Sequence, residues 1–217
     1  MAVLPSTPVR DVEPFPDHHN DLAGTLKFAW QMVGRGVHDR RSAFHAPVLA
    51  TQSPQGPQAR VLVLRALDVQ TRTLTFHTDI RSAKILELQA DQRAALTFYD
   101  APRKTQLRMS GIVGVHANDA ISQQRFNGSR PSSLRCFLGA QPGAVSAVPT
   151  SGLPVGVEGR EPEWIELQAA EPQFAVLNVF VQRLEWLHLH TAGQRRAVFD
   201  WSDGLVGSTC DMHWLNP

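Results

Sequence analysis

Two cations stand close together where the sequence predicts the start of a helix. Arg81 and Lys84 are three residues apart, so they share one face of the helix that the apolar spacing predicts after Thr78. The N-terminal end of a helix carries about half a positive charge, and each cation there costs roughly 0.3–1 kcal/mol. Either the two side chains are simply solvated, or an anion lies against them and the free N–H groups of the first turn. With the hydroxyls of Thr78 and Ser82 as further donors, the second interpretation predicts a phosphate site.

Two strands joined by a turn are predicted directly before this helix. Residues 60–67 are apolar and rich in β-branched side chains, with a charge near each end, which is typical of a buried strand. Residues 73–78 alternate between apolar and polar side chains, which indicates a second strand with two different faces. Residues 68–71 form the hairpin connection between the strands. Thr78 or Asp79 then caps the helix.

These three segments resemble the flavin-binding core of the pyridoxamine 5′-phosphate oxidase family. They read Arg60-Val-Leu-Val-Leu-Arg65, Phe76-His-Thr78 and Ser82-Ala-Lys84. The family pattern at this spacing is Arg-x-Val-Leu-Leu-Lys, then aromatic-Thr-Asn, then Ser-Arg-Lys. The resemblance implies a mainly β protein with peripheral helices, namely an FMN-binding split β-barrel. It also implies a homodimer that holds FMN at the subunit interface.

The resemblance further implies which residues hold FMN. Arg60, Lys84 and the turn around Thr78 and Ser82 would neutralise the phosphate, and the backbone of the first strand would lie along the ring. Gln106 is the first residue of the strand predicted over residues 106–115. At this position the family has a glutamine that hydrogen-bonds the flavin ring. The full set of implied cofactor-binding residues is Arg60, Val61, Leu62, Val63, Leu64, Arg65, His77, Thr78, Arg81, Ser82, Lys84 and Gln106.

The two arginines of the first segment cannot serve the same ligand group from a straight strand. Arg60 and Arg65 are five residues apart, so they project to opposite faces of the sheet. One of them would reach the phosphate and the other the flavin or substrate pocket. Both could reach one phosphate only if the strand carried a bulge.

Departures from the family pattern fall mainly on the substrate side. Ala83 stands where the family has an arginine on the FMN phosphate, and Arg81 would compensate from the same turn. Phe126 replaces a tyrosine and has lost its hydroxyl, whereas Arg130 matches an arginine that holds the substrate phosphate. The implied substrate-binding residues are therefore Arg65, Phe126 and Arg130. Because the family's C-terminal Arg-x-His pair is not clearly reproduced, we expect a member of the wider family with an unassigned substrate rather than the vitamin B6 oxidase.

The expected activity is that of an FMN-dependent oxidoreductase of the oxidase type. The flavin supplies the redox chemistry, so no side-chain acid or base is demanded and no catalytic residue is nominated. Two alternatives stay open. One is a flavin or haem carrier or sensor without turnover, and the other is a non-binding relative in which Ala83 marks a lost site.

Length and composition predict one domain without nucleic-acid or membrane chemistry. The chain has 217 residues and a formal net charge of +1, so no overall field attracts nucleic acid or a membrane surface. No segment approaches the length of a membrane span, and the N-terminus lacks the apolar run of a signal peptide. Cys136 and Cys210 lie far apart without a metal-binding spacing, and a reducing cytoplasm is the expected location. The phosphate-loop, dinucleotide and nucleophile-elbow motifs are absent from the sequence, which argues against nucleotide hydrolysis and a Rossmann domain.

The rest of the chain reads as support for this core. Residues 1–217 form a single expected domain, with an extended arm over 1–19 and a long loop over 139–162 that is rich in Gly, Pro, Ser and Ala. Helices are predicted over 21–37, 120–128 and 131–138, and further strands over 46–51, 94–99, 106–115, 173–190 and 195–201. His188 and His190 share a strand face at the spacing of a two-histidine metal pair. No third ligand is placed by the sequence, so no metal is expected.

Overall fold

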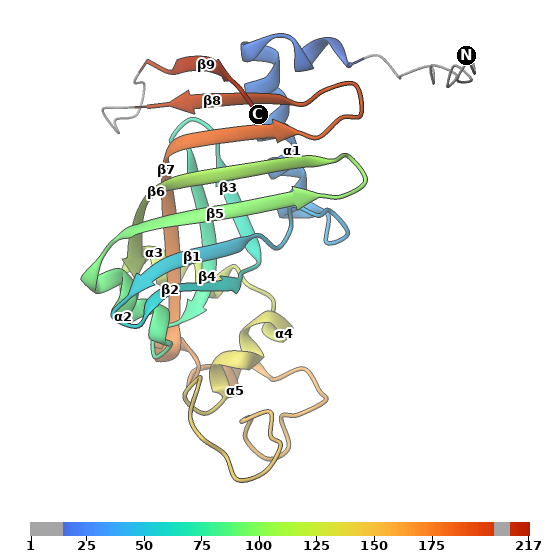
Figure 1. Ribbon diagram of the computed structural model, residues 1–217. Coiled ribbons are helices and arrows are strands. Elements are labelled where there is room, and N and C mark those ends of the chain that lie inside the picture. Colours follow the sequence, from blue (N-terminus) through green and yellow to red (C-terminus); the bar gives the residue numbers. More distant parts are fainter. Residues whose placement is uncertain (1–14, 202–208) are drawn as a thin grey trace, which may run out of the picture.

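One antiparallel sheet organises the protein, and its strands curl into a barrel with an extension at one end (Figure 1). The computed structural model describes residues 15–201 and 209–217. The strand order is β2-β1-β5-β6-β7-β4-β3, and β8 pairs with β7 and with β9. The strands are β1 (Val48–Ser53), β2 (Gly56–Val61), β3 (Leu64–Asp68), β4 (Thr73–Asp79), β5 (Arg93–Asp100), β6 (Thr105–His116), β7 (Phe174–His188), β8 (Arg195–Asp200) and β9 (Asp211–Leu215).

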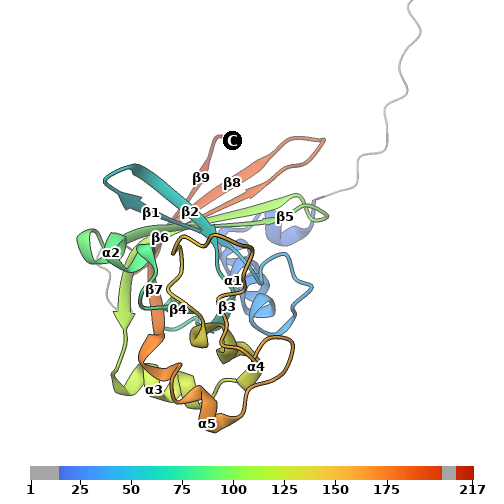
Figure 2. The same ribbon diagram turned by 90° about the horizontal axis from the view of Figure 1, so that it is seen from below.

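Helices surround the sheet, and all of them except α1 are short (Figure 2). They are the 3-10 turn η1 (Asp17–His19), α1 (Leu22–His38), α2 (Ala83–Ala90), α3 (Ala120–Asn127), α4 (Pro131–Leu134), the 3-10 turn η2 (Arg135–Leu138), α5 (Trp164–Leu167) and the 3-10 turn η3 (Glu171–Gln173). The prediction of a mainly β protein with peripheral helices is therefore confirmed. No helix of the described ranges is both long enough and apolar enough to cross a membrane.

Strand β7 is the central element because it pairs with three neighbours. Its first half, Phe174–Phe180, runs antiparallel to β4, whereas its second half, from Arg183 onward, pairs with β8. Strand β6 accompanies both halves and shifts register at Gly111. A Cβ atom at Gly111 would overlap the carbonyl oxygen of Phe180, so only glycine allows the two backbones to approach there. Strand β7 therefore belongs both to the barrel and to its extension.

The main core lies inside the barrel and under α1. The apolar stripe predicted for residues 21–37 is confirmed in α1, where Ala29, Trp30 and Val33 are buried. Asp21 caps this helix by accepting a hydrogen bond from the Gly24 amide at 2.7 Å. A second, smaller core cluster holds α3, α4 and α5 against the start of β7. Its residues are Phe126, Leu134, Phe137, Leu167, Ala170, Phe174 and Val176.

Two details differ from the sequence-based expectation, whereas the loop predicted over 139–162 agrees with it. The single strand predicted over 60–67 is two strands, because the chain leaves β1 after Val61 and crosses to β4. In the crossing, the Leu62 amide donates to the Pro47 carbonyl and the Leu64 amide to that of His45. Most of the arm expected over 1–19 lies outside the described residues, and its last part forms η1 instead of an extended chain. The chain between η2 and α5 contains no helix or strand within its described residues.

Candidate functional site

The turn between β4 and α2 is built by a carboxylate and holds Arg81 outside the helix. The Asp79 carboxylate accepts the Arg81 amide at 2.8 Å and pairs with its guanidinium at 2.6 Å. These local bonds compete with helix formation, so α2 begins only at Ala83, with Ser82 as its N-cap. The predicted cap at Thr78 or Asp79 and the shared helix face of Arg81 and Lys84 are therefore wrong. Arg81 also donates to the Gly139 carbonyl at 3.0 Å, so its charge is already neutralised within this turn.

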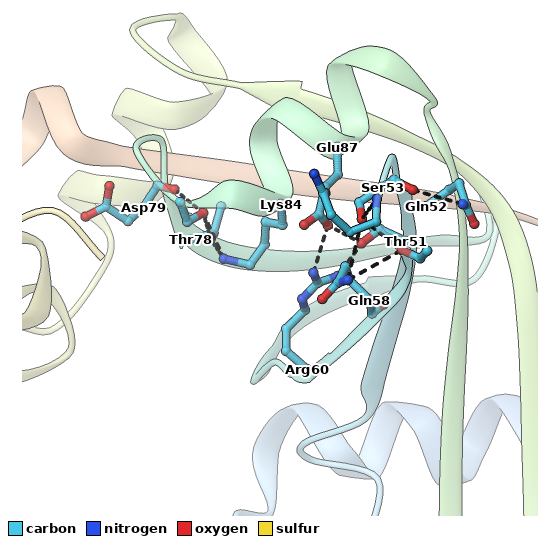
Figure 3. A network of polar contacts seen from close by, with 12 residues as sticks. Thr51, Gln52, Ser53, Gln58, Arg60, Thr78, Asp79, Lys84 and Glu87 are labelled. Carbon is cyan, nitrogen blue, oxygen red and sulfur yellow. Dashed lines mark hydrogen bonds and ion pairs between the residues drawn. The ribbon is translucent and has the colours of Figure 1, made fainter. Parts of the chain in front are cut away.

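Lys84 occupies a different environment, because its ammonium group meets hydroxyls and no carboxylate. Its Nζ donates to Thr78 Oγ1 at 3.0 Å and to Ser82 Oγ at 2.8 Å (Figure 3). No ion pair of Lys84 exists within the described parts of the chain. Burial and the neighbouring charge of Arg60 lower the pKa of Lys84, against the opposite influence of Asp79. A half-buried cation with a free donor and no ion-pair partner among the described residues is suited to bind an anion.

The first turn of α2 adds donors to this position. Ser82 is the N-cap, but its side chain makes no capping bond, since its hydroxyl donates to the Asp79 carbonyl at 2.7 Å. Amides of an uncapped first turn point outward and favour a negative charge. Lys84, Ser82 and Thr78 thus converge at the helix end, as the sequence predicted for a phosphate site.

Arg60 is held beside this site by a buried carboxylate. Its Nη2 pairs with Glu87 Oε2 at 2.7 Å, and the side chain of Glu87 is only 9 % exposed (Figure 3). The Arg60 guanidinium also donates to the Thr51 hydroxyl, and that hydroxyl donates to the same Glu87 oxygen. Three elements therefore fix Arg60, namely β1, β2 and α2. Lys84, Arg60 and Glu87 together leave one net positive charge, and Lys84 carries it.

Two of the predicted ring contacts, Val61 and Gln106, lie on one face of the sheet, here called the open face, whereas Leu64 is buried in the main core. Val61 is 61 % exposed, and Gln106 lies on the same face because it pairs directly with Tyr99. The register of β2, β1, β5 and β6 brings small and apolar side chains together on this face. Its residues include Val48, Ala50, Ala59, Val61, Ala95, Thr97, Tyr99, Gln106, Arg108 and Ser110, all exposed or half-buried, and Arg108 adds one charge to the face.

Arg65 points away from Lys84 into a separate cavity, here called the arginine cavity. The register of β3 shifts at Arg65, so this residue sits in a bulge next to β4. The cavity measures about 550 Å³ and has no aspartate or glutamate in its wall. Its lining residues are Arg40, Arg65, His77, Gln124, Arg125, Gly128, Ser129, Arg130 and Ser133.

Two predicted residues in the arginine cavity carry buried nitrogen atoms without partners. Arg65 Nε and His77 Nε2 have no hydrogen bond within the described residues. Burial, together with Arg65 and Arg125, lowers the pKa of His77 to about 4, so its ring is neutral near pH 7. His77 and Thr78 are neighbours on β4, and alternation sends them to opposite sides of the strand. One strand therefore separates the arginine cavity from the Lys84 site.

The structure does not bring all the predicted residues into these two places. Arg130 lies in the arginine cavity with Arg65, as the substrate prediction required. Phe126 is buried in the second core cluster and does not line that cavity. Neither Arg40 nor Arg125 was singled out by the sequence analysis. No periodic signal could have found them, because only the tertiary fold brings the turn after α1 next to α3.

The histidine pair noted in the sequence packs with a third ring, with His188 as the last residue of β7 and His190 two residues beyond it. His188 and His190 stack at 5.7 Å between ring centroids, and His19 lies 4.4 Å from His188. Burial and the neighbouring histidines lower the pKa of His19 to about 4. Within residues 15–201 and 209–217, no group of three or more His, Cys, Asp or Glu side chains is arranged to hold a metal ion.

Comparison with known proteins places these features in a sequence family. The family model described as "Pyridoxamine 5'-phosphate oxidase, FMN-binding domain" matches residues 29–117, which include Lys84 and the open face. Pyridoxine/pyridoxamine 5'-phosphate oxidase 1 of Ralstonia nicotianae is 37 % identical over 164 residues, covering 74 % of this chain and 68 % of the relative. The corresponding oxidase of Ralstonia pickettii is 37 % identical over 123 residues, and the chain spans only 53 % of its length.

Solved structures agree on the fold. A pyridoxamine 5'-phosphate oxidase-related, FMN-binding protein of Nostoc punctiforme superposes with a TM-score of 0.70 at 24 % identity, covering 88 % of this chain and 97 % of that protein. PhzG of Burkholderia lata, solved with tetrahydrophenazine-1-carboxylic acid, gives a TM-score of 0.65 at 18 % identity, covering 95 % and 99 %.

Proposed function

This chain belongs to the pyridoxamine 5′-phosphate oxidase family, and we propose that it is an FMN-dependent oxidoreductase with a substrate of its own. The predicted split β-barrel and the predicted cofactor, FMN, are both confirmed by this membership and by the fold. The reaction, the substrate and the residues that bind them are the proposal. The observation that carries it is the half-buried ammonium of Lys84, which has two hydroxyl partners and no carboxylate.

The residues at the start of α2 fit the phosphate of FMN. Lys84 would supply the main charge, with the Thr78 hydroxyl and the amides of the first turn as further donors, and Ser82 would hold Lys84 in place by accepting its hydrogen bond. Arg60 would stand beside them with its charge shared with Glu87. The isoalloxazine ring would lie against the chain that continues from Val61 into the crossing to β3, with Gln106 as a polar contact. FMN, when bound, accepts and releases the electrons of the reaction.

The arginine cavity supports an anionic substrate. Arg65 and Arg130 would bind and orient an anionic group of the substrate. The Nε–H group of Arg65, which has no hydrogen-bond partner among the described residues, would donate to this group. Neutral His77, on the same strand as Thr78, would form the wall of the cavity without adding a charge. The relatives point in the same direction, because one is named for a phosphate ester and another was solved with a carboxylic acid.

A homodimer would complete the flavin site. The open face presents apolar side chains on the outer side of four strands, and Val61 and Tyr99 are 61 % and 49 % exposed. A second copy of the chain would bury this face and enclose the ring that lies against it. Enclosure excludes water from the reacting part of the flavin. We therefore place FMN between two subunits.

Lysine substitution with a matched control tests the cofactor site. Lys84→Ala removes a charge-assisted bond worth about 1.5–3 kcal/mol, so FMN should bind roughly 10- to 100-fold more weakly. Lys27→Ala, on the exposed side of α1, should leave the affinity unchanged. Fluorescence titration of the flavin-free protein measures both values. Equal affinities in the two variants would remove Lys84 from the phosphate site.

Turnover separates an oxidoreductase from a carrier. Anaerobic mixing of the flavin-loaded protein with reduced donors, followed at the visible flavin absorbance, should show bleaching with one class of donor and reoxidation by oxygen. Stable flavin absorbance with every donor, together with tight FMN binding, would favour the carrier instead. Mass spectrometry of the released chromophore identifies the bound flavin.

A further inference from the structure

The arginine cavity carries more positive charge than one anionic group can balance. Nine arginines of the described residues form ion pairs with carboxylates. The four arginines of this cavity form none within residues 15–201 and 209–217, and no acidic side chain lines it. Four like charges around one space repel each other, so an anion would be favoured there, most of all at Arg65, because Arg40, Arg125 and Arg130 are exposed to solvent.

Burial makes this imbalance costly at the back of the cavity. Arg65 is half-buried, and its Nε has no acceptor. Burial and the nearby charge of Arg40 lower the pKa of Arg65. The neutral ring of His77 beside it offers no compensating charge. An unpaired buried guanidinium N–H destabilises the protein, and a bound anion would offset this cost.

The four arginines come from separate walls. Arg65 lies on β3, and Arg130 precedes α4, whereas Arg40 follows α1 and Arg125 belongs to the last turn of α3. Figure 2 shows α1 and α3 on opposite sides of β3 and β4. The volume of about 550 Å³ exceeds what a single phosphate group fills. Donors on several walls of a roomy cavity suit a ligand with charges at more than one end.

We propose that the arginine cavity takes a substrate with two separate anionic groups, the first held at Arg65 and Arg130 and the second reached by Arg40 from one wall or by Arg125 from the other. This inference rests on the proposed function, because it describes the substrate of the same oxidoreductase. A phosphate or carboxylate would serve as the first group and a carboxylate as the second. Planar arginine forks bind carboxylates through two parallel hydrogen bonds, which makes the second group a determinant of specificity.

Two simple probes distinguish one anionic group from two. Benzoate carries one carboxylate, and benzene-1,3-dicarboxylate carries two on the same ring. Calorimetric titration of the FMN-loaded protein at fixed ionic strength should give at least about tenfold tighter binding for the dicarboxylate, since each charge-assisted contact contributes about 1.5–3 kcal/mol. Equal affinities for the two probes would overturn the proposal.

Variants assign the second group to its arginines. The double variant Arg40→Ala/Arg125→Ala should bind the dicarboxylate within about threefold of benzoate, while its affinity for benzoate stays that of the wild type. Arg41→Ala, an exposed arginine beside Arg40 that does not line the cavity, should keep the full preference. Loss of the preference in Arg41→Ala as well would mean that general charge, not the cavity, attracts the probe.

The flavin provides an independent check. Both probes are titrated a second time into the flavin-free protein, and FMN affinity is measured for every variant. If FMN fails to bind but the dicarboxylate preference persists, the proposed reaction fails and the polyanion site stands. If FMN binds but the dicarboxylate preference is absent, the polyanion site fails and the proposed reaction stands.

Discussion

Replacing Glu87 with glutamine should make the protein less stable and yet bind FMN more tightly. Glu87 accepts hydrogen bonds from Arg60 and Thr51, and the side chains of the ion pair are 9 % and 23 % exposed. Glutamine keeps an oxygen for these donors but removes the negative charge. Removing one partner of a buried pair costs about 3–5 kcal/mol. Because the acceptor is retained and Arg60 reaches solvent, we expect the free energy of unfolding to fall by only about 1–2 kcal/mol.

The same change frees the charge of Arg60 for the cofactor. In the wild type, the carboxylate of Glu87 repels the phosphate that Lys84 attracts. Loss of one neighbouring charge near a protein surface changes a binding free energy by about 1 kcal/mol, so FMN affinity should rise roughly fivefold. Arg60→Ala should show the opposite pattern in binding, with a similar loss of stability.

Two measurements on the same samples test this reasoning. Urea denaturation of the flavin-free protein gives the free energy of unfolding, and flavin fluorescence gives the dissociation constant. Glu158→Gln, in the exposed loop, serves as the control and should change neither value. Weaker FMN binding in Glu87→Gln would refute the reasoning, because the carboxylate would then orient Arg60 toward the cofactor instead of competing with it.

Three further predictions concern the fold, its pH dependence and its assembly. The pKa of His77 is about 4 in the folded protein and 6.5 in the unfolded chain, so the unfolded chain takes up a proton first and stability should fall as the pH drops from about 6.5 to 4. In His77→Gln, the thermal melting temperature should depend less on pH across that range. Gly111→Ala should cost about 3 kcal/mol or more in urea denaturation, whereas Gly114→Ala on the same strand has room for its methyl group and should cost far less. Ala95→Glu on the open face should convert a dimer to a monomer in analytical ultracentrifugation, whereas Ile165→Glu on α5 should not.

Local patterns predicted most of the elements, because they depend on neighbours in the sequence. The alternation in β5 and β6 and the stripe of α1 are examples. The break between Val61 and Leu64 was missed, because an unbroken apolar run looks the same whether one strand or two use it. The start of α2 was missed because Asp79 bonds to the turn instead of capping the helix.

The candidate site was predictable only where it is local. Lys84, Ser82 and Thr78 lie within seven residues, so their spacing in the sequence nearly fixes their meeting in space. Arg60 was predicted as a phosphate ligand, but its pairing with Glu87 across 27 positions has no sequence signal. Arg40 and Arg125 meet Arg65 for the same long-range reason.

The order of synthesis sets a limit on when this protein can acquire its cofactor. Residues 73–79, which carry Thr78, pair with residues 174–180 of β7, about a hundred positions later in the chain. Until residues 174–180 have been synthesised, β4 lacks β7 as its neighbour, and the strand that carries Thr78 is not yet fixed beside Lys84. Such distant pairing is slow to form and leaves a strand edge exposed to other chains in the meantime. A nascent chain therefore has to wait for its last third before FMN can contribute to its stability.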